Sequence, residues 1–403
     1  MNILMINKYY YLRGGAERYF FDLSDLLESK GHRVIPFAMQ HPQNIKTPYS
    51  KYFVSEVKTD KVSFSYQGLR TVMRYFWSLK SRKKIKELLA QEKIDLVHLH
   101  NIYHQISPSI LPLFKKNDIP VVMTVHDYSL VSPNYTMFLR GRLYDKICGS
   151  GFWRCVPDRC VKNSYLASTV SSFEMWLHHS LLKIYRKHID IFIVPSQFVA
   201  DKLLSTGFDK KKIKIIPHFV SIENSKPSAY YKSKQLVYFG RLAKEKGIEI
   251  LLSAMHYLPD HKLKIAGAGP DEAKLKKLAE VLNLDNVQFV GTKNKEQLAK
   301  LVNLSHLSVM PSLAPESFGL SALESLFLAT PVVASKIGAL PEFLPTEWLF
   351  TAGDSRELVD KIIFLTKQDK HAILNKYIKS DELAKKYSQK IHYDKIYQIY
   401  SAL

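Results

Sequence analysis

The 403-residue sequence lacks long hydrophobic runs, and this shortage sets the first limits on the protein. No stretch of about 18 uncharged apolar residues occurs, so we expect no membrane-spanning helix. The first residues, Met1–Ile6, also lack the basic region, apolar stretch and cleavage site of a secretory signal. We therefore expect a cytoplasmic protein. Because a single core stops growing at about 250–300 residues, the length predicts two domains.

Cysteine is also scarce, and Cys148, Cys155 and Cys160 are the three present. Their odd number in a chain expected in the cytoplasm argues against a disulfide framework. Their spacing lacks the paired C-x2-C of common zinc sites. We therefore predict a loop with reduced thiols and no metal. A structural metal site on these cysteines, completed by His178 or His179, stays as the alternative.

Acidic residues are too few to balance the basic ones, since 58 Lys and Arg face 37 Asp and Glu, which leaves a net charge of +21. Such a surplus attracts phosphorylated substrates, anionic lipid or nucleic acid. The cations are spread along the chain, and no zinc-finger spacing, RNA-binding aromatic motif or basic-zipper heptad occurs. We therefore expect phosphate-bearing substrates and an anionic membrane surface as partners, and no nucleic acid.

Two series of alternating strand-like and helix-like segments divide the chain. The first has strand-like segments at 2–7, 33–38, 95–100, 120–126, 190–196 and 212–218. After an aperiodic linker at 219–232, the second has them at 236–240, 263–267, 287–291, 307–311, 331–335 and 349–351. The alternation predicts an α/β fold of two tandem Rossmann-like doubly wound domains, 1–218 and 233–383, that face each other across a cleft. Transferases, phosphorylases, epimerases and periplasmic-type binding proteins all remain open at this level.

The strongest motif lies at 315–324 and carries two carboxylates eight residues apart. We expect Glu316 just ahead of a helix and Glu324 about two turns later. The first backbone amides would then be available to phosphate oxygens, namely those of Phe318, Gly319 and Leu320. Glu324 suits ribose hydroxyls and Glu316 suits the hydroxyls of a bound sugar, although an acidic first turn is also a common helix cap.

A basic loop at 239–247 follows the first strand of the second domain. Its Arg241 and Lys246 stand five residues apart, so both side chains are expected to point into the cleft. Two fixed cations there would neutralise a leaving diphosphate. A solvated charge run is the alternative interpretation.

Two shorter signals lie in the first domain. Gly14 and Gly15 join the first strand to the first helix, which suggests an anion or sugar near a helix N-terminus, or only a tight turn. His126 closes the strand at 120–126, on the edge where substrates bind. The dinucleotide fingerprint G-x-G-x-x-G is absent.

These pieces, in this order, resemble the family 4 glycosyltransferases of the GT-B fold, over nearly the whole chain. The matching positions are Gly14-Gly15-Ala16-Glu17, Gly240-Arg241 with Lys246-Gly247, and Glu316 with Glu324. The resemblance implies a hexosyltransferase that takes a nucleotide-diphosphate sugar as co-substrate and needs no metal or other cofactor. It also implies retention of the anomeric configuration, and no Asp-x-Asp occurs in the chain.

The resemblance also implies roles for individual residues. Arg241 and Lys246 would hold the diphosphate, Glu324 would hold the ribose, and His126 would lie near the reacting carbon. The implied catalytic residues are His126, Glu316, Arg241 and Lys246. The implied donor-binding residues are Gly15, Arg241, Lys246, Glu316, Ser317, Phe318, Gly319, Leu320 and Glu324. Ser317 departs from the glycine of many relatives, and the helix expected at 384–403 would cross back to the first domain.

The acceptor is indicated by two basic amphipathic segments, Tyr66–Glu92 and Ser172–Lys187. Such stripes usually face a core, but tryptophan and phenylalanine among many cations also suit an anionic bilayer. We favour a lipid-linked glycan acceptor in capsule, exopolysaccharide or lipopolysaccharide synthesis, at the inner face of the cell membrane. A phosphorylase or sugar-nucleotide epimerase is the alternative, and a nucleic-acid-binding protein is a distant one.

Overall fold

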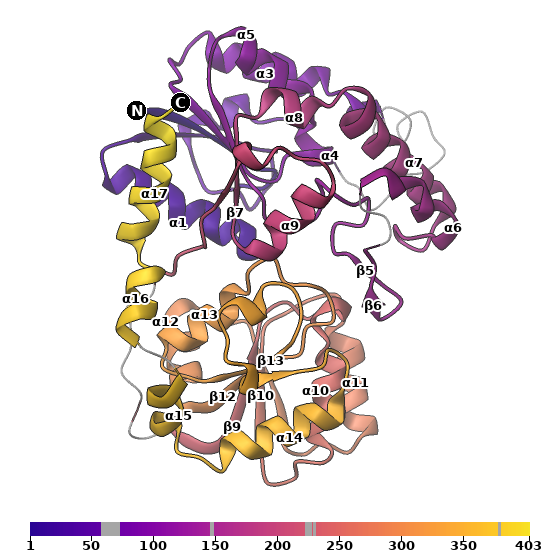
Figure 1. The fold of residues 1–403 in the computed structure, drawn as a ribbon, viewed down its shortest axis with the longest axis vertical. Coiled ribbons are helices and arrows are strands. Elements are labelled where there is room, and N and C mark those ends of the chain that lie inside the picture. Colours follow the sequence, from indigo (N-terminus) through magenta and orange to yellow (C-terminus); the bar gives the residue numbers. More distant parts are fainter. Residues whose placement is uncertain (58–72, 146–148, 222–227, 229–230, 378–379) are drawn as a thin grey trace. The chain divides into compact units, whose positions relative to one another are not determined.

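The computed structural model describes residues 1–57, 73–145, 149–221, 228, 231–377 and 380–403. These residues form two units (Figure 1). Unit 1 comprises Met1–Tyr135, Asp145–Pro217 and Tyr393–Leu403, and unit 2 comprises Thr136–Tyr144 and His218–His392. Within the described ranges, none of the helices combines the length and the apolar character needed to cross a bilayer.

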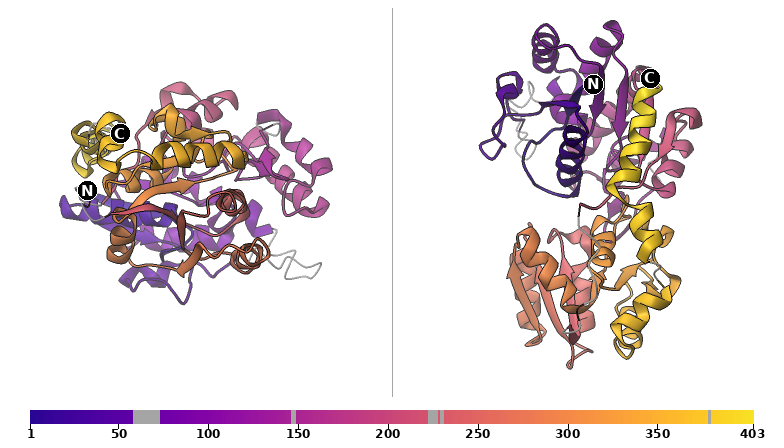
Figure 2. Two further views of the ribbon diagram at one scale, coloured as in Figure 1. Left: turned by 90° about the horizontal axis from the view of Figure 1, so that it is seen from below. Right: turned by 90° about the vertical axis from the view of Figure 1, so that its left-hand side faces the viewer.

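Unit 1 is built on a parallel sheet in the order β2-β1-β3-β4-β7-β8. Its strands are β1 (Asn2–Ile6), β2 (Arg33–Phe37), β3 (Leu96–Leu99), β4 (Val121–Thr124), β7 (Ile191–Val194) and β8 (Ile213–Ile215). The central strands are apolar along nearly their whole length because helices cover both faces of a parallel sheet (Figure 2).

The helices of unit 1 fill the crossovers between these strands. They are α1 (Gly15–Ser29), α3 (Leu79–Leu89), α4 (Tyr103–Ile106), α5 (Leu111–Lys116), α6 (Cys155–Asp158), α7 (Tyr165–Met175), α8 (Ile184–His188) and α9 (Gln197–Ser205), with a π-helical turn η4 (Trp176–Leu181). Short 3-10 turns lie at η1 (Pro48–Tyr52), η2 (Pro108–Ile110), η3 (Gly149–Arg154) and η5 (Lys210–Lys212). Serine caps several starts, as where the Ser196 hydroxyl accepts from the Val199 amide at the start of α9.

Unit 2 contains a second parallel sheet in the order β11-β10-β9-β12-β13-β14. Its strands are β9 (Lys232–Phe239), β10 (Lys262–Ala266), β11 (Val287–Gly291), β12 (Ser305–Met310), β13 (Val332–Ser335) and β14 (Leu349–Phe350). A separate hairpin pairs β5 (Phe138–Leu139) with β6 (Arg142–Leu143). The predicted α/β class with two parallel, doubly wound sheets is confirmed.

Side chains of β9 alternate between two cores, which shows that helices cover both faces of this sheet. Leu236 and Tyr238 join the larger cluster, which includes residues of α10 (Ile248–Met255), α11 (Glu272–Val281) and α14 (Ser355–Thr366). Val237 and Phe239 join a smaller cluster beneath α12 (Lys295–Asn303). The remaining elements of unit 2 are α13 (Leu320–Phe327), α15 (Lys370–Tyr377), α16 (Ser380–Lys386), η6 (Lys244–Lys246), η7 (Leu340–Glu342) and η8 (Thr346–Trp348).

The structure interrupts the helical segments at two places. Between β3 and β4, α4 ends at Ile106 and η2 and α5 follow, because Ser107 adopts a positive φ of 73°. The helix expected at 384–403 is split into α16 and α17 (Gln389–Ser401). Tyr400 of α17 is buried within unit 1.

The cysteine prediction is wrong, because Cys155 and Cys160 are joined by a disulfide. Helix α6 ends at Arg159 in the left-handed conformation, and the Cys160 amide donates to the Cys155 carbonyl at 3.0 Å. This turn brings the two Cα atoms to 5.0 Å, within the range that a disulfide spans. Cys148 lies outside the described residues.

The alternative of a metal site concerned these cysteines together with His178 or His179. Both ring nitrogens of His178 have partners, at 2.9 Å from a Glu174 oxygen and 2.9 Å from the Phe76 carbonyl. His179 is buried and stacks on the Tyr185 ring. In the part of the chain that the structure describes, no group of three potential ligands gathers for a metal ion.

Candidate active site

The strand order of unit 2 reverses between β9 and β12, and the predicted donor residues follow these two strands. In doubly wound sheets, ligands bind at such a switch point, beyond the carboxyl ends of the strands. The loop after β9 contains Arg241 and Lys246, and the loop after β12 contains Glu316. The topology therefore brings the two predicted motifs to one place within unit 2.

An ion pair joins these loops. The Lys246 ammonium lies 2.7 Å from Oε1 of Glu316, and the Ser312 hydroxyl donates to the same oxygen at 2.5 Å. Burial raises the pKa of Glu316, but the Lys246 charge and the two hydrogen bonds outweigh it, so the pKa is lowered overall. Glu316 is therefore a carboxylate at neutral pH, with one oxygen held in a fixed position.

Arg241 occupies a more open position in the same loop. Its guanidinium lies 3.8 Å from the Glu245 carboxylate, and half of its side chain is exposed. The backbone carbonyl of Glu245 accepts from the amides of Leu313 and Ala314, which ties this loop to the one after β12. Arg241 is thus held near the switch point while its charge remains accessible to an anion.

Gly247 makes the close contact between the two loops possible. Its φ is +66°, and a Cβ at this position would lie 1.9 Å from the Pro311 carbonyl oxygen. No side chain fits there, so the loop after β9 packs backbone to backbone on the end of β12.

Helix α13 begins later than the sequence predicts. Gly319, at a φ of +95°, is the N-cap, and the helix starts at Leu320. Glu324 therefore lies just over one turn into the helix instead of about two, and it is buried. The first amides of the helix are those of Leu320 and Ser321, so Phe318 and Gly319 precede it. Ser317 is partly buried in this preceding turn.

The side chain of Phe318 belongs to a core. Its ring stacks on Phe343 at a centroid distance of 5.7 Å and contacts His218 and Tyr387. Any contribution of Phe318 to a ligand therefore comes from its backbone.

The residues of the predicted site that belong to unit 1 also lie beyond the carboxyl ends of parallel strands. Its sheet reverses order between β1 and β3, and the two strand ends are tied by a bond from the Asn101 amide to the Asn7 side chain at 3.2 Å. Gly15 is exposed at the first position of α1, with Gly14 as an extended N-cap. His126 is buried just after β4, and burial, with Lys8 nearby, lowers its pKa to about 3.

His126 is part of a stack of histidines that was not predicted from the sequence. The ring of His100 lies parallel to it at 5.1 Å, and His98 lies beyond His100 at 4.6 Å. His100 Nδ1 is 2.8 Å from His126 Nε2, and the Tyr400 hydroxyl is 2.5 Å from His98 Nδ1. The available signal was the i and i+2 spacing of His98, on β3, and His100, directly after this strand. Ser312, two residues after β12, was not predicted either.

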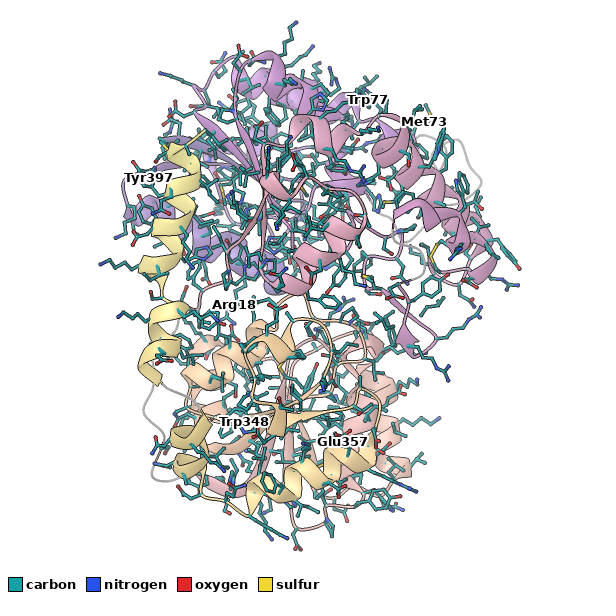
Figure 3. The ribbon with its side chains drawn as sticks, viewed as in Figure 1. Arg18, Met73, Trp77, Trp348, Glu357 and Tyr397 are labelled. Atoms are coloured by element: carbon teal, nitrogen blue, oxygen red, sulfur yellow. A yellow bond between two sulfur atoms is a disulfide. The ribbon has the colours of Figure 1, made fainter. Side chains whose placement is uncertain are left out.

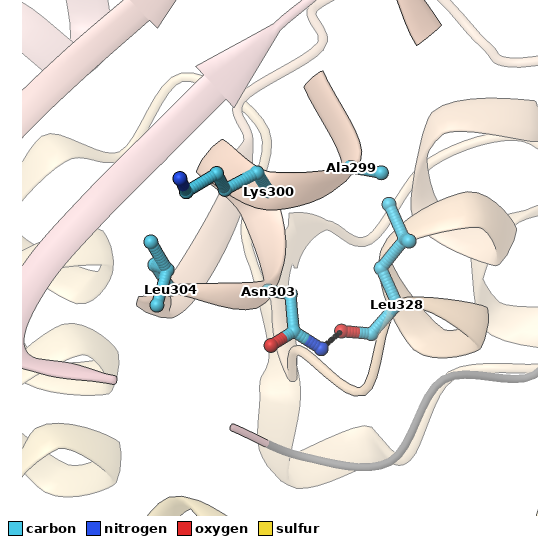
Figure 4. A pocket seen from close by; sticks show the side chains of 5 residues that line it. All are labelled: Ala299, Lys300, Asn303, Leu304 and Leu328. Atoms are coloured by element: carbon cyan, nitrogen blue, oxygen red, sulfur yellow. Dashed lines mark hydrogen bonds between the residues drawn. The ribbon is translucent and has the colours of Figure 1, made fainter. Parts of the chain in front are cut away.

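A separate surface hollow lies elsewhere in unit 2. It has a volume of about 280 Å³ and is lined by Ala299, Lys300, Asn303, Leu304 and Leu328 (Figure 4). The Asn303 amide donates to the Leu328 carbonyl at 2.9 Å. Because Leu328 follows the last turn of α13, the hollow lies at the opposite end of this helix from Gly319 and is not the predicted donor site.

Two family models match the chain. The one described as Glycosyltransferase Family 4 matches residues 13–224, and the one described as Glycosyl transferases group 1 matches residues 221–384. They meet at the linker between the two series of strands.

Individual proteins and solved structures also resemble the chain. An uncharacterized 42.6 kDa protein in the cps region of Klebsiella pneumoniae is 26% identical over 85% of this chain and 87% of its own length. A phosphatidyl-myo-inositol mannosyltransferase of Mycobacterium leprae is 23% identical over 100% of this chain and 97% of its own. Among solved structures, HepE of Anabaena in complex with UDP and glucose superposes with a TM-score of 0.67 at 18% identity, covering 100% of both chains.

The superposition on HepE shows only that the two proteins share a fold. The family assignment comes from the two family models. The first of these models spans more than half of the chain, and the second covers the segment that holds the Lys246–Glu316 pair. The protein therefore belongs to glycosyltransferase family 4, and it is a GT-B enzyme that uses a nucleotide-sugar donor.

Proposed function

We propose that this enzyme transfers a hexose, with retention of configuration and without a metal, from a nucleoside-diphosphate sugar to a lipid-linked glycan of a cell-surface polysaccharide. The donor half rests on one observation, the Lys246–Glu316 pair at the switch point of unit 2. The relative in the cps region of Klebsiella supports a role in capsule-like polysaccharide synthesis. The Mycobacterium leprae relative, named for a phosphatidylinositol, supports a lipid acceptor.

In this proposal, Lys246 and Arg241 bind the diphosphate and stabilise the charge that develops as it leaves. In the structure, Lys246 is paired with Glu316. A bound diphosphate competes for Lys246, and Glu316 then accepts hydrogen bonds from the sugar hydroxyls. Glu324 binds the ribose, and the amides at the start of α13 bind phosphate oxygens. In unit 1, His126 orients the sugar and Gly15 approaches the donor.

The donor assignment is tested by calorimetric titration with UDP, GDP and ADP, starting with UDP because HepE holds it. One nucleotide is expected to bind wild type tightly, and both Glu324→Ala and Lys246→Ala are expected to weaken binding at least about tenfold. Lys274→Ala is the matched control. Its ammonium also lies 2.7 Å from a carboxylate, that of Glu249, but this pair joins α11 to α10 and its lysine is 64% exposed.

Equal binding by wild type, Glu324→Ala and Lys246→Ala would overturn the site. Binding of none of the three nucleotides would reopen the phosphorylase and epimerase alternatives. Strict dependence on inorganic phosphate identifies a phosphorylase, and product formation without an acceptor identifies an epimerase. A chelator such as EDTA is expected to leave turnover unchanged, since the proposal assigns the charge stabilisation to Arg241 and Lys246.

The acceptor half rests on an apolar and basic surface of unit 1, here defined as Met73, Trp77, Phe173, Leu181, Lys80 and Arg82. The four apolar side chains are between 38% and 62% exposed, and Figure 3 shows Met73 and Trp77 at the outside of unit 1. Residues 66–72 of the predicted amphipathic segment lie outside the described residues.

Contacts within this surface join its two segments into one face. The Phe76 ring meets Phe173 edge-on at 5.5 Å, and the Phe76 carbonyl is hydrogen-bonded to His178 of η4. The Arg82 guanidinium lies 5.3 Å from the Trp77 ring centre. Exposed aromatic and aliphatic groups beside cations suit the headgroup region of an anionic bilayer.

Flotation with vesicles of phosphatidylglycerol and phosphatidylcholine tests this surface. Wild type is expected to float at low salt, and the double variant Met73→Ser, Trp77→Ser is expected to stay in the bottom fraction. Val281→Ser, which removes an equally exposed apolar side chain from unit 2, is the control. Absence of wild-type flotation at low salt would remove the membrane part of the proposal. Steep salt-dependent binding to duplex DNA would instead favour the nucleic-acid alternative.

A further inference from the structure

The histidine stack beside His126 connects three elements of unit 1. His98 belongs to β3 and His100 directly follows it, and the two rings stack on one another, while His126 follows the neighbouring strand β4. All three rings are buried, and consecutive rings are inclined by only 24° and 17°. Tyr400 of α17 meets the outer ring, His98.

Specific hydrogen bonds hold this stack. His98 Nε2 is 2.7 Å from the Thr124 hydroxyl, and His98 Nδ1 faces the hydroxyl of Tyr400. Burial raises the pKa of Tyr400, so its hydroxyl stays protonated. The Tyr400 and Thr124 hydroxyls thus hold the two ring nitrogens of His98 from opposite sides of the ring. At the other end, His100 Nδ1 and His126 Nε2 share one proton in a bond of 2.8 Å.

Aromatic rings of α1 close the stack from the side. Tyr19 lies 5.4 Å from the His126 ring and 6.0 Å from the His100 ring, and Phe20 meets His100 edge-on at 5.0 Å. Apolar residues would fill this volume at lower cost, because a buried imidazole must keep its hydrogen bonds to offset desolvation. The polar rings therefore specify an orientation as well as filling space.

We propose that His100 is a positioning residue for His126, and that Tyr400, acting through His98, holds the opposite end of the same stack. The bond to His100 fixes the tautomer and the ring plane of His126, as outer partners fix catalytic imidazoles in general. The significance for transfer rests on the proposed role of His126, but the positioning is a property of unit 1 alone. Helix α17 is in this way connected to His126.

His100→Phe tests the positioning, because phenylalanine keeps a stacked ring and removes the bond to His126. With ¹⁵N-histidine labelling, the wild-type protein is expected to show His126 as one neutral tautomer, assigned by its loss in His126→Asn. In His100→Phe the tautomer is expected to change or to become a mixture. With a sugar of the nucleotide that the titration identifies as donor, release of the nucleoside diphosphate is expected to fall roughly tenfold in kcat, with little change in KM, as for the loss of one hydrogen bond.

His261→Phe is the matched control, since it removes a histidine hydrogen bond of 2.9 Å, to Thr366, within unit 2. It is expected to leave the His126 signals and kcat unchanged. An unchanged His126 tautomer in a folded His100→Phe protein would overturn the positioning. If His126→Asn itself turns over normally, the proposed role of His126 fails instead, and the NMR result still decides the positioning.

The outer end is tested by Tyr400→Phe against Tyr397→Phe, two hydroxyl deletions one turn apart on α17. Tyr397, which Figure 3 labels, is 42% exposed. Tyr400 is buried. Tyr400→Phe is expected to shift the His98 nitrogen signals and to lower kcat about two- to threefold, and Tyr397→Phe is expected to do neither. Equal spectra for both variants would show that Tyr400 does not hold the stack.

Discussion

The two units place different chemistry at corresponding points of similar sheets. At the switch point of unit 2, the Lys246–Glu316 ion pair joins the loops after β9 and β12, and Arg241 stays half exposed beside it. At the corresponding edge of unit 1, buried neutral rings surround His126, whose pKa is lowered to about 3. In the proposed function, the charged edge of unit 2 binds the diphosphate and the neutral edge of unit 1 orients the sugar.

The two units also differ in the interactions that hold the carboxyl edge of the sheet in place. In unit 2 the geometry depends on backbone packing and charged side chains, as at Gly247 and Lys246. In unit 1 it depends on aromatic side chains from three different elements, α1, β3 and α17. Variants that change one kind of support should therefore affect one unit and leave the other unchanged.

The largest expected effect is that of Gly247→Ala. A Cβ there would lie 1.9 Å from the Pro311 oxygen, so the two loops must separate, and we expect unit 2 to lose at least about 3 kcal/mol of unfolding free energy. Gly291→Ala is the control, because Gly291 has nearly the same φ of +68°, but a Cβ there would meet no atom of the described residues within 4 Å. Gly291→Ala should lower the unfolding free energy by about 1 kcal/mol. Similar losses in urea unfolding would contradict the backbone contact.

The second-largest effect is expected from Lys246→Ala. Removing this cation takes away charge stabilisation of the leaving diphosphate, and we expect kcat/KM for the donor to fall about 100-fold. The His126 tautomer, read by ¹⁵N NMR, should stay as in wild type because unit 1 keeps its support. Lys274→Ala should leave both measurements unchanged. If kcat/KM of Lys246→Ala fell by less than about threefold, Lys246 would not stabilise the transition state.

His126→Phe should change how unit 1 responds to acid. Because burial lowers the folded pKa of His126 from 6.5 to about 3, the unfolded chain binds a proton that the folded chain does not between these values. Stability from this group is therefore lost as pH falls from about 6.5 towards 3. The wild-type unfolding free energy should fall by up to about 1.4 kcal/mol per pH unit more steeply than that of His126→Phe.

Urea unfolding at pH 6, 5 and 4.5 measures this slope. Tryptophan fluorescence mainly follows unit 1, which contains Trp77, Trp153 and Trp176, while Trp348 belongs to unit 2. Equal slopes for wild type and His126→Phe would show that the ring is not kept neutral in the folded protein.

Much of the fold follows from local pattern. The alternation of β-rich and helical segments predicted the strands of both sheets within a few residues, because a buried parallel strand is an unbroken apolar run. The positions of Lys246 and Glu316 after their strands were also readable, since a parallel sheet gathers its carboxyl ends on one edge.

Contacts between segments that are distant in the sequence could not be predicted from local pattern. Nothing near His98 indicates that Tyr400, 302 residues later, meets its ring. The bond between Cys155 and Cys160 depends on a left-handed Arg159, a conformation that the local sequence does not favour. The start of α13 at Leu320 depends on Gly319, whose missing Cβ leaves room for Leu340. Each of these features is decided by packing instead of periodicity.

The smallest effect is expected from Ser312→Ala, which removes one of the two hydrogen bonds to Oε1 of Glu316. Burial raises the pKa of Glu316, while Lys246 and the Ser312 hydroxyl lower it, so deleting the hydroxyl should move this pKa upward. The acid limb of turnover should shift to higher pH, because protonated Glu316 no longer accepts from the sugar. The Lys246 pair persists, so donor affinity at pH 7.5 should fall only about fivefold, the value of one hydrogen bond.

Ser321→Ala, in the first turn of α13, is the control for hydroxyl loss near the same switch point. Ser312→Ala should shift the acid limb, and Ser321→Ala should leave it in place. The effect also separates the two units, because the titration of His126 in unit 1 should not respond to either change. An acid limb that moves equally in both variants would mean that Ser312 does not tune Glu316, and that the Lys246 charge alone holds this carboxylate ionised.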